Sequence, residues 1–113
     1  MRDVSLYLRD ILEAMIAIEG FVEGQSFDDF RADDKTSSAV VRKFEVIGEA
    51  AKQIPEEIRN KYTTVPWKEM AGMRDRLIHF YFGIKYELVW HTIEDVIPIV
   101  KPVIQDMLKD IGK

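Results

Sequence analysis

Hydrophobic residues recur along this chain at three- and four-residue steps, the spacing typical of amphipathic α-helices. The pattern predicts four long helices, over residues 2–23, 36–53, 66–82 and 86–110. No stretch alternates apolar and polar residues with the period of two that marks a half-buried strand. The sequence therefore predicts an all-α fold: an antiparallel up-and-down bundle of four main helices plus short helical turns.

Several residues predict where these helices are capped or interrupted. Ser26 can cap a short helical turn before the second long helix, and Pro55 can begin another short helix after it. Gly83 is predicted to end the third long helix. Pro98 and Pro102 each remove a backbone donor from the fourth, so we expect a kink or break there.

Gly48 lies in the middle of the second predicted helix. Glycine there costs about 1 kcal/mol relative to alanine because it loses more backbone freedom on folding. Close packing of this helix against a neighbour would compensate for that cost. We therefore interpret Gly48 as a structural residue.

The composition narrows the class of protein. A chain of 113 residues is expected to form one domain with a single core, and 47% hydrophobic with 32% charged residues is typical of a soluble globular protein. The absence of cysteine excludes disulfides, a thiol nucleophile and thiolate metal sites. No apolar run is long enough to cross a membrane, and the first residues are too polar for a secretory signal. A cytoplasmic protein without a membrane partner is expected.

The charge is unevenly distributed. A net charge of −4 argues against a protein that coats nucleic acid in general. Residues 59–85, however, hold six basic residues against two acidic ones, a local balance of +4. A basic patch there could hold a phosphate backbone, although scattered solvated charges would give the same count.

Arg74, His79 and Tyr81 stand within eight residues of one another in an otherwise largely apolar stretch. They supply a planar cation for phosphate, an imidazole that titrates near neutral pH and a hydroxyl group. These groups are typical of a site that cleaves phosphodiesters. Asp75, four residues before His79, could orient the imidazole, and Arg76 could bind phosphate.

The same residues also have structural interpretations. On a continuous helix, Arg74 and Tyr81 share the apolar face of Met70. The arginine would then pair with a carboxylate on a neighbouring helix, such as Glu49, and the tyrosine would be a core aromatic. His79 would lie about 140° from Arg74, so one ideal helix does not bring the two together. Either the helix loosens towards its end, or two copies of it build the site.

Two clusters hold side chains of the kinds that bind metal ions. The first lacks the glycine turn and terminal glutamate of a calcium loop, and the second has no clear third ligand. No glycine-rich phosphate loop occurs either. We interpret both clusters as surface and predict no metal and no cofactor. Their members are Asp28, Asp29, Asp33 and Asp34 in the first cluster, and His91, Glu94 and Asp95 in the second.

Four segments resemble, in this order, the HepT-like ribonuclease toxins, a branch of the HEPN superfamily of small helical proteins. They are residues 7–14 (YLRDILEA), 46–52 (VIGEAAK), 65–70 (VPWKEM) and 74–81 (RDRLIHFY), the last with the spacing Arg74-x4-His79-x-Tyr81. Lys85 departs from the pattern, because an acidic or amide residue is expected there.

The resemblance implies a metal-independent endoribonuclease, the toxin of a toxin–antitoxin pair, that acts on RNA and not on DNA. Arg74 would bind the phosphate, His79 would shuttle protons and Asp75 would orient His79. It also implies a homodimer with the motif at the interface, and a nucleotidyltransferase antitoxin that transfers AMP to Tyr81. The acidic net charge and the helical-wheel conflict favour an alternative, a non-catalytic helical adaptor that binds a nucleotidyltransferase.

Overall fold

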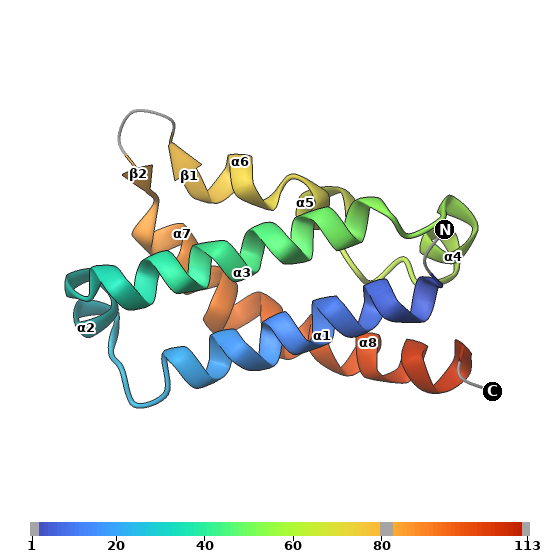
Figure 1. Ribbon diagram of the computed structural model, residues 1–113, viewed down its shortest axis with the longest axis horizontal. Helices are drawn as coiled ribbons and strands as arrows, with labels where there is room; N and C mark the ends of the chain where they lie inside the picture. Colours follow the sequence, from blue (N-terminus) through green and yellow to red (C-terminus); the bar gives the residue numbers. More distant parts are fainter. Residues whose placement is uncertain (1–2, 80–82, 112–113) are drawn as a thin grey trace.

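The computed structural model describes residues 3–79 and 83–111, and in that part of the chain nearly all regular structure is helical (Figure 1). The predicted all-α class is confirmed. The elements are α1 (Val4–Phe21), α2 (Phe27–Ala32), α3 (Asp34–Lys52), α4 (Glu56–Lys61), α5 (Trp67–Ala71), α6 (Met73–Leu77), β1 (Ile78–His79), β2 (Gly83–Ile84), α7 (Tyr86–His91), the π-helical turn η1 (Thr92–Val96) and α8 (Ile97–Ile111).

The long helices α1, α3 and α8 lie side by side, with α1 packed against both of the others. In Figure 1, α5 and α6 lie on the opposite side of α3 from α1, and α3 contacts both. The apolar faces of these elements meet in a shared hydrophobic core. None of the helices in the described ranges is long and apolar enough to cross a membrane.

The first two long helices are confirmed to within about two residues at each end, the usual uncertainty of helix boundaries. The helical turn after Ser26 is also confirmed and forms a capping box. The hydroxyl of Ser26 accepts a hydrogen bond from the Asp29 amide at 3.1 Å, and the Asp29 carboxylate accepts one from the Ser26 amide at 3.1 Å. Pro55 precedes α4 as its N-cap instead of being its first helical residue.

The prediction of one continuous helix over residues 66–82 is wrong. Gly72 separates α5 from α6, and α6 ends at Leu77. The chain then forms a short antiparallel hairpin in which Ile78 pairs with Ile84 and His79 with Gly83. Five of the seven residues from 78 to 84 are β-branched or aromatic, a composition that favours strand over helix.

Gly83 has a different role from the predicted one. Its φ of +81° lies in the left-handed region that favours glycine, and it belongs to β2 instead of ending a helix. The amide of Lys85 donates a hydrogen bond to the carbonyl oxygen of Leu77 at 2.8 Å. This bond and the β1–β2 pairing anchor the root of the hairpin to the end of α6.

The predicted interruption of the last helix is confirmed near Pro98. The chain makes a π-helical turn, η1, directly before α8. Proline lacks an amide hydrogen, and its ring clashes with the carbonyl group four residues earlier, here that of Glu94, so the wider turn relieves both problems. The break expected at Pro102 is not found, because α8 continues through that residue.

The structural interpretation of Gly48 is confirmed. A Cβ atom at this position would lie 3.0 Å from the carbonyl oxygen of Met70 and 3.4 Å from that of Ala71. Such distances to backbone atoms leave no room for a side chain. Gly48 therefore lets α3 approach α5 closely and positions the segment that leads to the hairpin.

Candidate functional site at the root of the hairpin

Arg74 lies on the solvent side of α6. The buried side chains of that helix are Met73 and Leu77, so Arg74, Asp75 and Arg76 are left exposed. The placement of Arg74 within the apolar Met70 stripe is wrong, because Gly72 interrupts the helix between Met70 and Arg74.

The guanidinium group of Arg74 nevertheless has a carboxylate partner on a neighbouring helix. Its Nε lies 3.3 Å from Oε2 of Glu45 on α3, and the arginine side chain remains 60% exposed. The expected kind of partner is therefore present, but it is Glu45, one helical turn before Glu49. Glu49 instead pairs with Lys52 at 3.1 Å. Because Arg74 is paired and exposed, it is held in place while its remaining N–H groups can reach a ligand.

His79 is carried by β1 and pairs through its backbone with Gly83. Its side chain, like all of Tyr81, lies outside the described part of the structure. The predicted helical spacing of Asp75 to His79 is wrong, since α6 ends at Leu77 and His79 belongs to β1. The predicted placement of Tyr81 on the same face as Arg74 falls outside the described residues. The motif is instead divided between the last turn of a helix and a hairpin.

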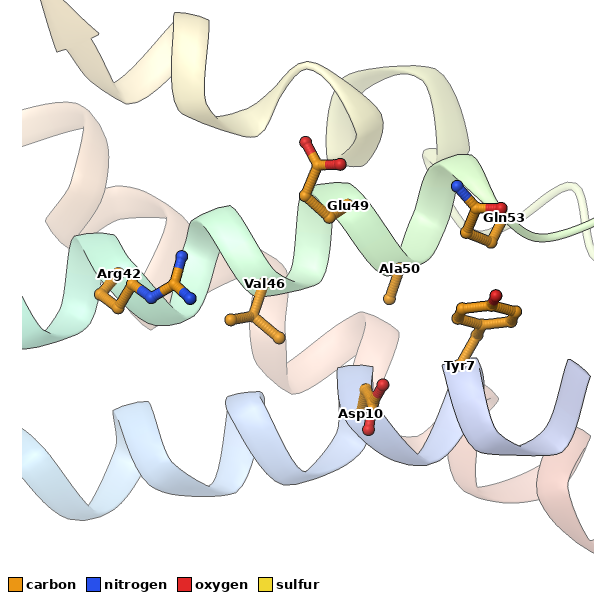
Figure 2. Close-up of a pocket in the computed structure, with 7 residues that line it drawn as sticks. All are labelled: Tyr7, Asp10, Arg42, Val46, Glu49, Ala50 and Gln53. Atoms are coloured by element: carbon orange, nitrogen blue, oxygen red, sulfur yellow. The ribbon is translucent and has the colours of Figure 1, made fainter. Parts of the chain in front are cut away.

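A groove of about 420 Å³ lies between α1 and α3 (Figure 2). Tyr7 and Asp10 project into it from α1, while Arg42 and Glu49 come from α3. It is lined by Tyr7, Asp10, Arg42, Val46, Glu49, Ala50 and Gln53. Sequence reasoning missed this groove, although the segments 7–14 and 46–52 that carry the family resemblance supply most of its lining. The presence of both segments in one chain was the sequence signal that could have predicted a shared groove.

Two shifted pKa values have structural causes. Hydrogen bonds from the side chain and amide of Thr36, and from Gln25, lower the pKa of Asp33, the N-cap of α3. The hydroxyl of Tyr62 donates to Asp110 at 3.0 Å, and this bond to a carboxylate raises the pKa of the tyrosine. These residues stabilise helix ends and contacts between helices; they do not assign catalytic chemistry.

His91 belongs to the second cluster of possible metal ligands, with Glu94 and Asp95. Its Nδ1 lies 2.7 Å from Oδ2 of Asp95, one turn further along the chain. Both side chains are exposed. The pairing fixes the plane of the imidazole ring and leaves Nε2 as the nitrogen that can meet a ligand.

Comparison with known proteins identifies the family. A family model described as "Ribonuclease HepT-like" matches residues 11–107. The chain belongs to the HepT-like ribonuclease family. A "Putative RNase" of Methanocaldococcus jannaschii is 49% identical over 110 residues, which cover 97% of this chain and 91% of that protein. A "Probable ribonuclease HepT" of Thermococcus cleftensis is 47% identical over 95 residues, which cover 84% of this chain and 86% of its relative.

A third relative, a "Putative RNase" of Caldanaerobacter subterraneus subsp. tengcongensis, is 46% identical over 103 residues, covering 91% of this chain and 92% of that protein. No solved structure matches the chain. The family assignment therefore rests on sequence over almost the whole chain.

Proposed function

We propose that residues 1–113 form one HEPN-like helical domain, an antiparallel bundle of four main segments, that acts as a metal-independent endoribonuclease. The observation that carries the proposal is the exposed guanidinium of Arg74 at the start of the segment that leads into the hairpin with His79. Membership of the HepT-like ribonuclease family supports it. So does the naming of relatives as ribonucleases.

In the proposed reaction the RNA supplies the nucleophile, its own 2′-hydroxyl group. His79 accepts the 2′-hydroxyl proton as the oxygen attacks phosphorus, and it returns a proton to the departing 5′-oxygen. Arg74 binds the phosphate and stabilises the negative charge that develops on it. The P–O5′ bond breaks, which leaves a 2′,3′-cyclic phosphate and a 5′-hydroxyl.

Neighbouring residues would assist these two groups. Asp75, exposed on α6 beside Arg74, would orient His79. Arg76 would contact the phosphate backbone. Glu45 would hold Arg74 in position until the RNA phosphate, with stronger charge and more acceptor oxygens, takes over part of its hydrogen bonding.

The direct test is cleavage of end-labelled RNA by the purified protein in excess chelator. We expect cleavage to continue and the products to carry 2′,3′-cyclic phosphates. His79→Ala should abolish it while leaving the melting temperature nearly unchanged, because the hairpin pairs through backbone groups. A single 2′-deoxy nucleotide at the cut site should protect the RNA. Intact RNA, or cleavage that needs a divalent cation, would reject the proposal.

We further propose that the active form is a homodimer in which two copies complete each site. Exposed apolar side chains on the long helices, Leu6, Ile16 and Phe21 on α1 and Ile99 on α8, support association with another copy. The placement of the motif at the interface comes from the family resemblance alone, since these side chains lie on α1 and α8 and not on α6. Sedimentation at micromolar concentration should give twice the monomer mass of 13.2 kDa. A monomer that still cleaves RNA would remove this part of the proposal.

The regulatory part of the proposal is a toxin–antitoxin pair acting in the cytoplasm. A nucleotidyltransferase antitoxin would transfer AMP from ATP to the hydroxyl of Tyr81, releasing pyrophosphate. The motif places Tyr81 two residues after His79, so the adduct would add bulk and negative charge next to the site.

A non-catalytic adaptor for a nucleotidyltransferase is the second candidate function. The net charge of −4 favours it, because an acidic surface repels RNA away from the hairpin. In that case RNA stays intact, and His79→Ala changes neither RNA nor the affinity for the transferase.

A further inference from the structure

A second cavity lies between α5–α6 and the α7–η1 segment. Its volume is about 160 Å³. Buried apolar side chains of α5 and α6 form one wall, and half-buried Leu88 and Val96 form the other. Met70, Met73 and Leu77 belong to the first wall, and the polar members of the lining are Glu69, Arg76, His91 and Thr92.

The cavity adjoins the candidate site. Leu77, on its wall, is the last residue of α6 and directly precedes the hairpin with His79. The hydrogen bond from the Lys85 amide to the Leu77 carbonyl oxygen ties the other end of the hairpin to the same place. A group seated in the cavity would therefore lie next to the root of the hairpin.

The polar groups of the cavity have defined hydrogen-bonding roles. Thr92 is only 6% exposed, and its hydroxyl donates to the Leu88 carbonyl oxygen at 2.7 Å. Its oxygen can then only accept a further hydrogen bond. Arg76 and His91 are exposed and supply nitrogen atoms at the surface end of the cavity. The lining thus combines apolar walls with a hydroxyl oxygen that can accept, the exposed cation of Arg76 and the exposed carboxylate of Glu69.

We propose that this cavity binds one pyrimidine base of the RNA, next to the phosphodiester that is cleaved. The inference rests on the proposed nuclease function for its choice of RNA as the ligand. The volume equals that of about five water molecules at roughly 30 Å³ each, which is enough for a pyrimidine ring and leaves less free space around the larger purine. Methionine sulfur contacts aromatic rings favourably, and Met70 and Met73 line the cavity.

The edges of a pyrimidine match the polar groups. Cytosine offers an amino group and uracil an N–H, either of which can donate to the Thr92 oxygen. The carbonyl oxygen of the ring can accept from Arg76, and the attached backbone phosphate would remain outside, near Arg76 and His91. The π-helical turn that Pro98 imposes forms part of the wall, so this proline shapes the cavity.

Methyl NMR on methionine-labelled protein tests binding without depending on cleavage. Met70 and Met73 line the cavity, whereas Met15 and Met107 are buried in α1 and α8 and serve as internal controls. The probes are short 2′-O-methyl RNAs, which cannot be cleaved, with one pyrimidine among adenines or with adenines alone. We expect the pyrimidine RNA to shift the Met70 and Met73 signals selectively. Equal shifts with the all-adenine RNA, or no shift with either, would overturn the inference.

Two variants sharpen the test. Val96→Phe should fill the cavity and remove the Met70 and Met73 shifts, while unchanged Met15 and Met107 signals report an intact fold. Thr92→Val removes the acceptor and should weaken pyrimidine binding several-fold. Arg76→Ala should also weaken pyrimidine binding. Lys68→Ala is the control, because it removes a positive charge from α5 outside this cavity and should leave pyrimidine binding unchanged.

Cleavage patterns separate this inference from the proposed function. Wild-type protein should cut RNA mainly at sites with a pyrimidine at one fixed position, and Val96→Phe should reduce that preference several-fold. Pyrimidine-specific shifts without any cleavage would reject the nuclease and leave the base site standing. Cleavage with the same pyrimidine preference in wild type and Val96→Phe would reject the base site and leave the nuclease standing.

Discussion

Nε of Arg74 lies 3.3 Å from Oε2 of Glu45, which links the start of the motif Arg74-x4-His79-x-Tyr81 on α6 to the middle of α3. The arginine is mostly exposed and the glutamate is about one-third exposed. An exposed ion pair contributes little to the stability of the fold. The Glu45 carboxylate therefore acts mainly on Arg74: it orients the guanidinium group, and it competes with any incoming phosphate for that group.

Replacing that carboxylate should therefore affect RNA more than folding. In Glu45→Gln we expect RNA binding to tighten several-fold, because the negative competitor is gone, with a stability change below about 1 kcal/mol. Fluorescence anisotropy with uncleavable RNA and urea unfolding measure the two effects. Glu49→Gln is the matched control, since Glu49 pairs with Lys52 and should leave RNA affinity unchanged. Weaker binding in Glu45→Gln would show that orientation outweighs competition.

Arg74→Lys should lower the cleavage rate by about a hundredfold or more, because an ammonium group cannot reproduce the planar fork that meets phosphate. Single-turnover cleavage is the appropriate measurement. Arg42→Lys, an exposed arginine of α3 in the other groove, is the control and should cleave normally. Full activity in Arg74→Lys would remove Arg74 from phosphate stabilisation.

Gly48→Ala should destabilise the protein by about 1–3 kcal/mol, because the new methyl group would lie 3.0 Å from the Met70 carbonyl oxygen. This cost exceeds the gain of about 1 kcal/mol in helix propensity. Gly20→Ala, also in a helix but with nothing within 4 Å of the added atom, should instead be neutral or stabilising. Urea unfolding of both variants measures the difference, and equal effects would contradict the close approach of α3 to α5.

The N-cap of α3 predicts a dependence of stability on acid pH. Hydrogen bonds hold the pKa of Asp33 below its usual 3.8, so the folded state binds fewer protons there than the unfolded state. Its stabilising effect is present above about pH 4 and is lost as the pH falls through the lowered pKa. Asp33→Asn should cap the helix without this pH dependence, and Asp33→Ala should lower the melting temperature by a few degrees at neutral pH. If wild type and Asp33→Asn gave identical melting curves at acid pH, Asp33 would not be the source of the pH dependence.

Tyr81→Phe should retain at least partial nuclease activity yet escape neutralisation by a nucleotidyltransferase antitoxin. The phenyl ring keeps the shape of the side chain and removes only the hydroxyl that would receive AMP. Intact-mass spectrometry after incubation with the transferase and ATP gives the direct measurement, with Tyr86→Phe as the control. An adduct on Tyr81→Phe, or full activity of AMP-modified wild type, would rule out the switch.

The sequence alone determined the all-α class, the two N-terminal long helices, the Ser26 cap and the structural role of Gly48. It also determined the motif residues that the proposal uses. These features follow from signals within a few residues of one another: helical periodicity, cap chemistry and the steric effect of glycine. The interruption near Pro98 belongs to the same group, because proline acts on the turn that precedes it.

Only the tertiary structure decided what became of residues 66–82. Their apolar residues do recur with helical periodicity, but Gly72 and the β-prone sequence after Leu77 allow the segment to break into α5, α6 and a hairpin. A continuous helix and this broken form have similar local energies, so packing on α3 decides between them. The partner of Arg74 is Glu45, 29 positions earlier, and Arg76 and His91 line the same cavity. Contacts between residues so far apart leave no periodic trace in the sequence, because they depend on how whole helices pack.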